Sequence, residues 1–232
     1  MTPELLSFAS GQDLAKALAN AVASALAAAV AVRGEASIAV SGGSTPKAFF
    51  EALSNEEIDW PNVTVTLVDE RFVPPDNPRS NHLLIATHLL QNAAASARFV
   101  PLYQPAASAE DAARIATEKT ATIGHPFDVV VLGMGGDGHT ASFFPGGDHL
   151  AQALDLSLPR RVLAMEAEGA GEPRLTFSFS SLHDARLLVL HIEGAEKKAV
   201  LERALAGTDE AEMPIRAVFN RAASPLEIYW AP

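Results

Sequence analysis

The chain has 232 residues, and its 17 Lys and Arg against 28 Asp and Glu give a formal net charge of −11. It contains no cysteine, which excludes disulfide scaffolds, thiolate zinc sites and a cysteine nucleophile. The acidic balance argues against a nucleic-acid partner, so an anionic ligand would need a small local basic cluster.

The N-terminal region predicts neither a secretory signal nor a membrane span. Met1-Thr2-Pro3-Glu4 has no basic segment, and the longest apolar stretch, 14–32, is mostly alanine and contains Lys16, Asn20 and Ser24. We therefore expect a cytoplasmic protein with no membrane partner.

Helix and strand signals alternate along the chain. The first helix is predicted over 11–32, between Ser10 as N-cap and Gly34 as its C-terminal stop. Apolar periodicity predicts further helices at 47–53, 82–91, 109–123 and 195–206. Apolar and β-branched runs predict strands at 36–40, 63–68, 127–132, 161–165, 186–192 and 226–230. This alternation indicates one α/β domain over 1–232, with a parallel sheet covered on both faces.

Three chemically rich segments directly follow predicted strands, namely 41–46, 69–71 and 133–139. Ligands of parallel α/β sheets bind beyond the carboxyl ends of the strands. We therefore expect these segments to meet at one edge of the sheet.

The first segment, Ser41-Gly42-Gly43-Ser44-Thr45-Pro46, joins a strand to a helix. Glycines allow close approach of the backbone to a ligand, and free N–H groups at a helix N-terminus suit an anion. Pro46 fits the first helical position. A capped helix start without a ligand is the alternative, although it explains the second glycine poorly.

The third segment, Gly133 to Gly138, matches the letters of a dinucleotide fingerprint. That fingerprint opens a long helix, whereas Pro145 follows only seven residues after the last glycine. The more informative pair is Asp137 and His139, because a carboxylate two residues before an imidazole can orient or polarise it.

Basic candidates for an anion site are Arg71, Arg79, Arg174 and Lys197. Lys197 falls in the first turn of a predicted helix, where its charge opposes the helix dipole. The histidines show no metal-ligand spacing and nothing like a serine-hydrolase motif surrounds Ser44, so we expect no metal and no acyl-serine chemistry.

Taken together, these segments resemble 6-phosphogluconolactonases, of the glucosamine-6-phosphate isomerase/6-phosphogluconolactonase family. The resemblance runs over nearly the whole chain, in order. It is carried by 41–46, 69–74 with Ser80-Asn81, 133–145, Arg174-Leu175-Thr176 and Gly194-Ala195-Glu196-Lys197. It implies a three-layer αβα fold with a mostly parallel sheet, of the type of glucosamine-6-phosphate deaminases and ribose-5-phosphate isomerase.

The resemblance also implies the reaction. The expected partner is a small-molecule sugar-phosphate lactone, 6-phospho-D-glucono-1,5-lactone, hydrolysed to 6-phospho-D-gluconate in the second step of the oxidative pentose phosphate pathway. No cofactor or metal is expected, and the enzyme would be a monomer or a small homo-oligomer.

By the same resemblance, His139 would be the general base that activates water, and Asp137 would orient it. Backbone N–H groups of the turns 42–45 and 135–138 are candidates to stabilise the oxyanion. The residues expected to bind substrate or its phosphate are Gly42, Gly43, Ser44, Thr45, Asp69, Arg71, Gly135, Arg174 and Lys197. Whether Arg71 contacts the phosphate or the lactone, and what Asp69 does, stays open.

The sequence also offers two alternative functions. Glucosamine-6-phosphate deaminases share the glycine-rich turns, but they carry Tyr where this chain has Arg71 and a catalytic Glu where it has Phe144. A non-catalytic sugar-phosphate sensor would need a DNA-binding helix pair, for which the sequence gives no signal.

Overall fold

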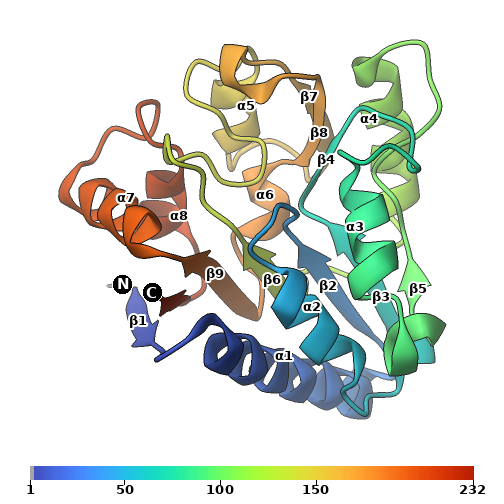
Figure 1. Cartoon of the computed structure of the whole chain (residues 1–232). Helices are drawn as coiled ribbons and strands as arrows, with labels where there is room; N and C mark the ends of the chain where they lie inside the picture. Colours follow the sequence, from blue (N-terminus) through green and yellow to red (C-terminus); the bar gives the residue numbers. More distant parts are fainter. Residues whose placement is uncertain (1–2) are drawn as a thin grey trace.

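The computed structural model describes residues 3–232, and its centre is a parallel seven-stranded sheet (Figure 1). Each neighbouring pair of strands runs parallel. The order across the sheet is β1 (Glu4–Ser7), β10 (Leu226–Ala231), β9 (Leu187–Glu193), β6 (Val129–Leu132), β2 (Ala36–Val40), β3 (Val63–Leu67) and β5 (Arg98–Phe99).

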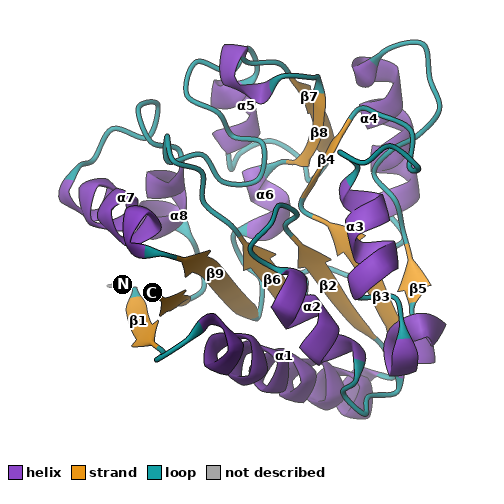
Figure 2. Cartoon of the chain, viewed as in Figure 1, coloured by secondary structure: helices purple, strands orange, loops and turns teal. Residues whose placement is uncertain are grey.

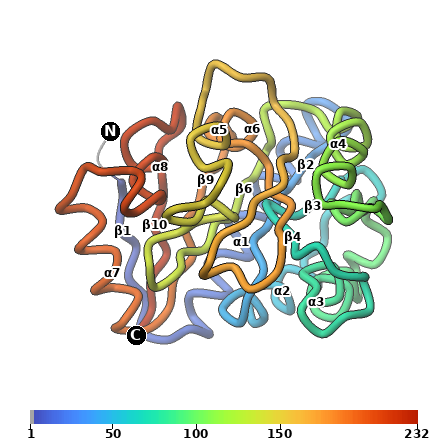
Figure 3. The backbone as a smooth tube through the Cα atoms, turned by 90° about the horizontal axis from the view of Figure 1, so that it is seen from above, coloured from blue at the N-terminus to red at the C-terminus, as the bar shows by residue number. Residues whose placement is uncertain are grey.

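Helices cover both faces of this sheet (Figure 2). They are α1 (Gly11–Arg33), α2 (Lys47–Ser54), α3 (Asn81–His88), α4 (Ala109–Thr120), α5 (Leu150–Leu154), α6 (Phe179–Leu182), α7 (Ala195–Ala206) and α8 (Ile215–Arg221), with 3₁₀ turns at Trp60–Asn62, Asn92–Ser96 and Glu168–Ala170. Seen from above, α1 and α2 lie on one side of the sheet, and α6 and α8 lie on the other (Figure 3). The expected three-layer αβα arrangement is confirmed.

Helix α1 belongs to the core. The Ser10 hydroxyl accepts a hydrogen bond from the Asp13 N–H, and Gly34 ends the helix with a φ of 79°. By length and composition α1 could cross a membrane. Its apolar row is instead fully buried in the core, at Leu14, Leu18, Val22 and Leu26. The helix is therefore stabilised by packing in this fold.

A second, antiparallel sheet lies beyond the carboxyl ends of the central strands (Figure 1). Its order is β4 (Asp69–Arg71), β8 (Arg174–Phe177) and β7 (Val162–Met165). The sequence predicts 69–71 as a segment directly after the strand 63–68, and the structure shows that this segment is itself the short strand β4. The chain leaves the central sheet at Val68, whose N–H bonds to the Val40 carbonyl while its own carbonyl accepts from Phe177.

The long elements are confirmed to within a few residues, with α7 found as predicted. The predicted strand 127–132 is shorter, as β6, and Pro46 occupies the N-cap of α2 rather than its first turn. Elements of two to seven residues were missed, namely β1, β5, β8, α5, α6 and α8. Such short segments carry too few residues for a periodic pattern, so tertiary pairing decides them.

Candidate active site

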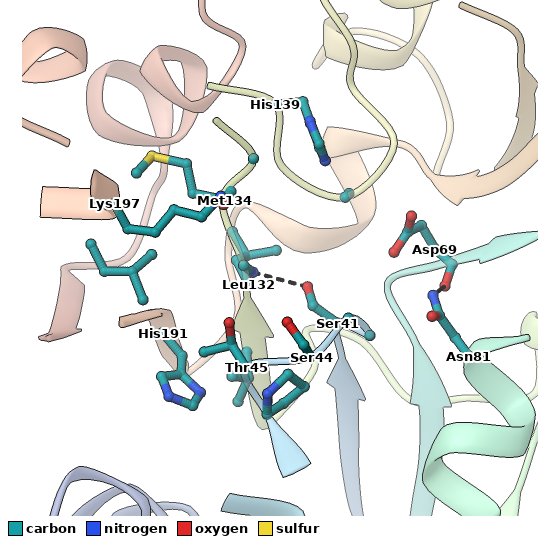
Figure 4. A pocket seen from close by; sticks show the side chains of 18 of the residues that line it. Ser41, Ser44, Thr45, Asp69, Asn81, Leu132, Met134, His139, His191 and Lys197 are labelled. Atoms are coloured by element: carbon teal, nitrogen blue, oxygen red, sulfur yellow. Dashed lines mark hydrogen bonds between the residues drawn. The ribbon is translucent and has the colours of Figure 1, made fainter. Parts of the chain in front are cut away.

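A cavity of about 220 Å³ opens where the three glycine-rich and charged segments meet (Figure 4). All the predicted binding residues line it, as does His139, while Asp137 lies beside it. The lining residues are Ser41, Gly42, Gly43, Ser44, Thr45, Pro46, Asp69, Arg71, Asn81, Val131, Leu132, Gly133, Met134, Gly135, His139, Ala141, Arg174, His191, Ile192 and Lys197.

The turn after β2 forms the floor of the cavity. A hydrogen bond of 3.0 Å from the Gly133 N–H to Ser41 Oγ ties this turn to the loop after β6. A Cβ atom at Gly42 would lie 1.9 Å from Asn81 Oδ1, so glycine is needed there for close approach of α3. Gly43 has a φ of 98°, which L side chains rarely adopt. Gly42 and Gly43 therefore present only backbone atoms to the cavity, beside the side chains of Ser44 and Thr45.

His139 is held by Asp137. The distance from His139 Nδ1 to Asp137 Oδ1 is 2.6 Å, and the His139 backbone N–H donates to the same oxygen. Burial alone would raise the pKa of Asp137, but the hydrogen bond and charge of His139 outweigh it and lower that pKa to about 2. Asp137 is thus ionised at neutral pH, which favours the proton of His139 on Nδ1 and leaves Nε2 to accept one.

Gly135 makes room for this pair. A Cβ atom there would lie 2.1 Å from His139 Nδ1 and 2.6 Å from Asp137 Oδ1. The glycine is therefore required by the geometry of the pair itself.

The backbone beyond His139 is fixed from two sides. Ala141 has a φ of 49°, an uncommon and strained conformation for a residue with a side chain. The next residue anchors it, because Ser142 Oγ donates to Asp69 Oδ2 at 2.6 Å and the Ser142 N–H donates to Thr176 Oγ1. Asp69 thus joins the second sheet to the loop that carries His139.

Arg71 and Arg174 face each other across the antiparallel pair of β4 and β8. Like charges directly opposite one another are destabilising, so an anion between them would be stabilising. Arg174 is only 8% exposed, donates to the Ala170 carbonyl and has Nη1 3.9 Å from Asp69 Oδ2. Burial lowers the pKa of Arg174, Asp69 opposes that shift, and the charge of Arg71 adds to it.

Lys197 reaches the cavity from another wall, the first turn of α7. Its Nζ donates to the Met134 carbonyl at 2.7 Å, and in Figure 4 it lies on the opposite side from Asp69. Arg79 does not line the cavity. Its guanidinium pairs with Glu172, and its backbone carbonyl accepts from Arg71.

Glu70 organises the chain around Arg71. This fully buried carboxylate accepts from the backbone N–H groups of Arg71, Asn81 and His82 and from Ser80 Oγ. Burial raises the pKa of Glu70, and these hydrogen bonds oppose the shift. The carboxylate fixes β4 against the start of α3.

We expect Glu70→Gln to destabilise the protein by about 2–3 kcal/mol, because one amide oxygen cannot replace two carboxylate oxygens and a buried N–H loses its acceptor. Thermal unfolding measures the loss. The exposed Glu57→Gln is the matched control and should change stability by less than about 0.5 kcal/mol. Equal melting temperatures for the two variants would contradict this role of Glu70.

Some lining residues were not predicted. Asn81 appeared in the sequence only as part of a motif, and its packing against Gly42 is a contact between distant segments. The sequence around His191 indicates no role for it, and the structure buries it on β9 with its Nε2 3.0 Å from Glu193 Oε1. No local pattern marks either residue. Within residues 3–232, no group of three or more His, Asp or Glu could hold a metal ion.

The chain is similar to known proteins over nearly its whole length. Residues 9–230 match the family model described as glucosamine-6-phosphate isomerases/6-phosphogluconolactonase. The chain is 67% identical to a 6-phosphogluconolactonase of Rhizobium meliloti, over 100% of both chains. It is 52% identical to one of Mesorhizobium japonicum, over 97% of this chain and 94% of that one.

Solved structures of related proteins have the same fold as this chain. A crystal structure of a 6-phosphogluconolactonase from Shewanella baltica superimposes with a TM-score of 0.96 at 41% identity, covering 99% of this chain and 98% of that one. A monomeric glucosamine-6-phosphate deaminase superimposes with a TM-score of 0.79 at 18% identity, covering 98% and 97% of the two chains. The latter likeness concerns the fold alone.

Proposed function

Since the chain belongs to the glucosamine-6-phosphate isomerase/6-phosphogluconolactonase family, we propose that it hydrolyses 6-phospho-D-glucono-1,5-lactone to 6-phospho-D-gluconate. The observation that carries the proposal is the joint lining of one cavity by His139, oriented by Asp137, and by Arg71, Arg174 and Lys197. A proton acceptor can activate water for attack on the neutral ester carbonyl of a lactone. A cluster of cations can bind the phosphate of a phosphorylated sugar. The full-length relatives named above are 6-phosphogluconolactonases.

The proposed chemistry needs only water and His139. Water attacks the lactone carbonyl carbon while His139 Nε2 takes a proton from it, forming a tetrahedral intermediate. Collapse of the intermediate re-forms the carbonyl and breaks the bond to the ring oxygen, which receives the proton from His139. The turn 42–45 lines the cavity, and its backbone N–H groups would stabilise the oxyanion. Of the turn 135–138 only Gly135 lines the cavity, and its N–H donates to the His139 carbonyl.

The phosphate would bind to Arg174 and Lys197, with Arg71 as a third donor. Arginine suits bidentate contact with phosphate oxygens, and lysine supplies a point charge. The formal net charge of −11 gives little long-range attraction for an anion. Affinity therefore depends on short-range contacts inside the cavity.

For Asp69 we propose a positioning role. Its carboxylate accepts from Ser142 and lies near Arg174, so it links the His139 loop to the pair of strands β4 and β8 that carries the two arginines.

We also propose that the chain is a single-domain enzyme that acts in the cytoplasm. One family match over 9–230 supports the single domain, and the burial of the apolar face of α1 supports a location away from the membrane.

The purified protein should accelerate lactone hydrolysis well above the spontaneous rate, which must be subtracted in every assay. Titration of the acid released, with freshly generated lactone, measures the rate. Glucosamine 6-phosphate serves as the contrasting substrate, and ammonia release from it should stay at background. Ammonia release without lactone hydrolysis would replace the proposal with a deaminase.

A further inference from the structure

The ring of Phe144 contacts two functional side chains at once. Its centroid lies 4.4 Å from that of the His139 imidazole, with the two planes inclined by 39°. Arg174 Cζ lies 5.3 Å from the same Phe144 centroid. Phe144 itself is 3% exposed, so its ring is held by the surrounding structure.

The loop between the two aromatic rings explains how they meet. Thr140 and Phe143 form an isolated antiparallel bridge, with the Phe143 N–H donating to the Thr140 carbonyl at 2.9 Å. Ala141, with its positive φ, turns the chain inside that bridge. The Phe144 carbonyl then accepts from the Gly147 N–H at 3.0 Å. This tight turn returns the chain so that Phe144 packs on the imidazole.

His139 needs such a contact more than Arg174 does. Among residues 3–232 the imidazole has one hydrogen bond, to Asp137, and the side chains of His139 and Asp137 are 31% and 45% exposed. A single hydrogen bond leaves the ring free to tilt about it, whereas a packed ring on its face opposes tilting. Arg174 is buried and is also held by the Ala170 carbonyl and the nearby Asp69.

We propose that Phe144 is a positioning residue, whose ring holds the His139 imidazole in the orientation that Asp137 alone would not maintain. Through its second contact, the same ring ties that orientation to the buried guanidinium of Arg174. The activity readout of this inference rests on the proposed lactonase function, and a spectroscopic readout does not.

The neighbouring Phe143 provides a matched control. It is 1% exposed and packs edge-on against Phe179, and it is outside the cavity lining. We expect Phe144→Leu to lower kcat by about tenfold or more, because small displacements of a reacting group are costly, while KM changes by less than about threefold. Phe143→Leu loses a buried ring of the same size and should keep kcat within about threefold of wild type.

A double variant tests whether Phe144 acts through His139. Adding Phe144→Leu to His139→Ala should change the residual rate by less than about twofold, because the group that it positions is gone. A further tenfold loss on that background would overturn the inference, as would equal losses of kcat in Phe144→Leu and Phe143→Leu.

NMR separates this inference from the proposed function. The imidazole signals of His139, assigned by their loss in His139→Ala, should shift in Phe144→Leu and stay in place in Phe143→Leu. Unchanged signals in Phe144→Leu would overturn the positioning role. If the wild type fails to hydrolyse the lactone, the proposed function is wrong and the NMR comparison still decides the role of Phe144.

Discussion

Replacing His139 with alanine is expected to lower kcat for lactone hydrolysis by about 10²–10⁴-fold, the usual contribution of proton transfer by a positioned side chain. His139 is the histidine that combines a place in the cavity lining with a hydrogen bond to a carboxylate of lowered pKa. Folding should be unaffected, because the side chain is 31% exposed and lies on a loop. Steady-state kinetics with circular dichroism as a folding check measure both effects.

His149 is the control for this substitution. It also lies on a loop beside an aspartate, with its Nδ1 3.1 Å from Asp148, but it is outside the cavity lining. His149→Ala should keep wild-type kcat. Asp137→Asn should lower kcat by a smaller factor than His139→Ala does. It changes the partner that orients the base, whereas the base itself stays in place. Wild-type turnover in His139→Ala would show that His139 is not the general base.

The second large effect is expected on KM. Arg174→Ala and Lys197→Ala should each raise KM for the lactone by about 10–100-fold with little change in kcat. A hydrogen bond to a charged group contributes about 1.5–3 kcal/mol, and each 1.4 kcal/mol is a factor of ten in affinity. The same variants should weaken competitive inhibition by inorganic phosphate, which reports binding without catalysis.

Lys198 is the control for Lys197. The two residues are neighbours on α7, but Lys198 Nζ lies 4.1 Å from the Trp230 ring centroid and is not part of the cavity lining. Lys198→Ala should leave KM unchanged. Because Arg174 is buried, Arg174→Lys is the second variant, and it should give an intermediate KM since lysine keeps the charge and loses the planar fork. Unchanged KM in both Arg174→Ala and Lys197→Ala would remove these residues from the phosphate site.

The parts of the site that the sequence predicted are local in the chain. Asp137 and His139 are two residues apart, so a turn of glycines suffices to bring a carboxylate to an imidazole. The segment 41–46 follows a strongly apolar strand, and parallel strands place their carboxyl ends at one edge. Both features depend on short-range geometry, and the expected meeting of three segments at one cavity follows from the rule for parallel sheets.

The remaining features depend on pairing between distant segments. The sequence places Arg71 directly after a strand and Arg174 before Leu175-Thr176-Phe177, and nothing in either segment indicates that the two arginines face each other. Arg79 is also an arginine and lies only eight residues after Arg71, yet it pairs with Glu172 and is outside the cavity lining. Which arginine lines the site is decided by the three-residue strand β4, which is too short to be predicted from its pattern.

The amino-acid sequence by itself determined the alternation of helices and strands, the glycine-rich turns at the strand ends, the Asp137–His139 pair and the need for a local basic cluster in an acidic chain. Only the tertiary structure decided that a second sheet closes the site, that Asn81 packs against Gly42, and that Phe144 contacts both His139 and Arg174. The physical reason is the distance along the chain over which each kind of interaction acts. Periodicity and turn chemistry act between residues a few positions apart, whereas these contacts form only when strand pairing and core packing bring remote segments together.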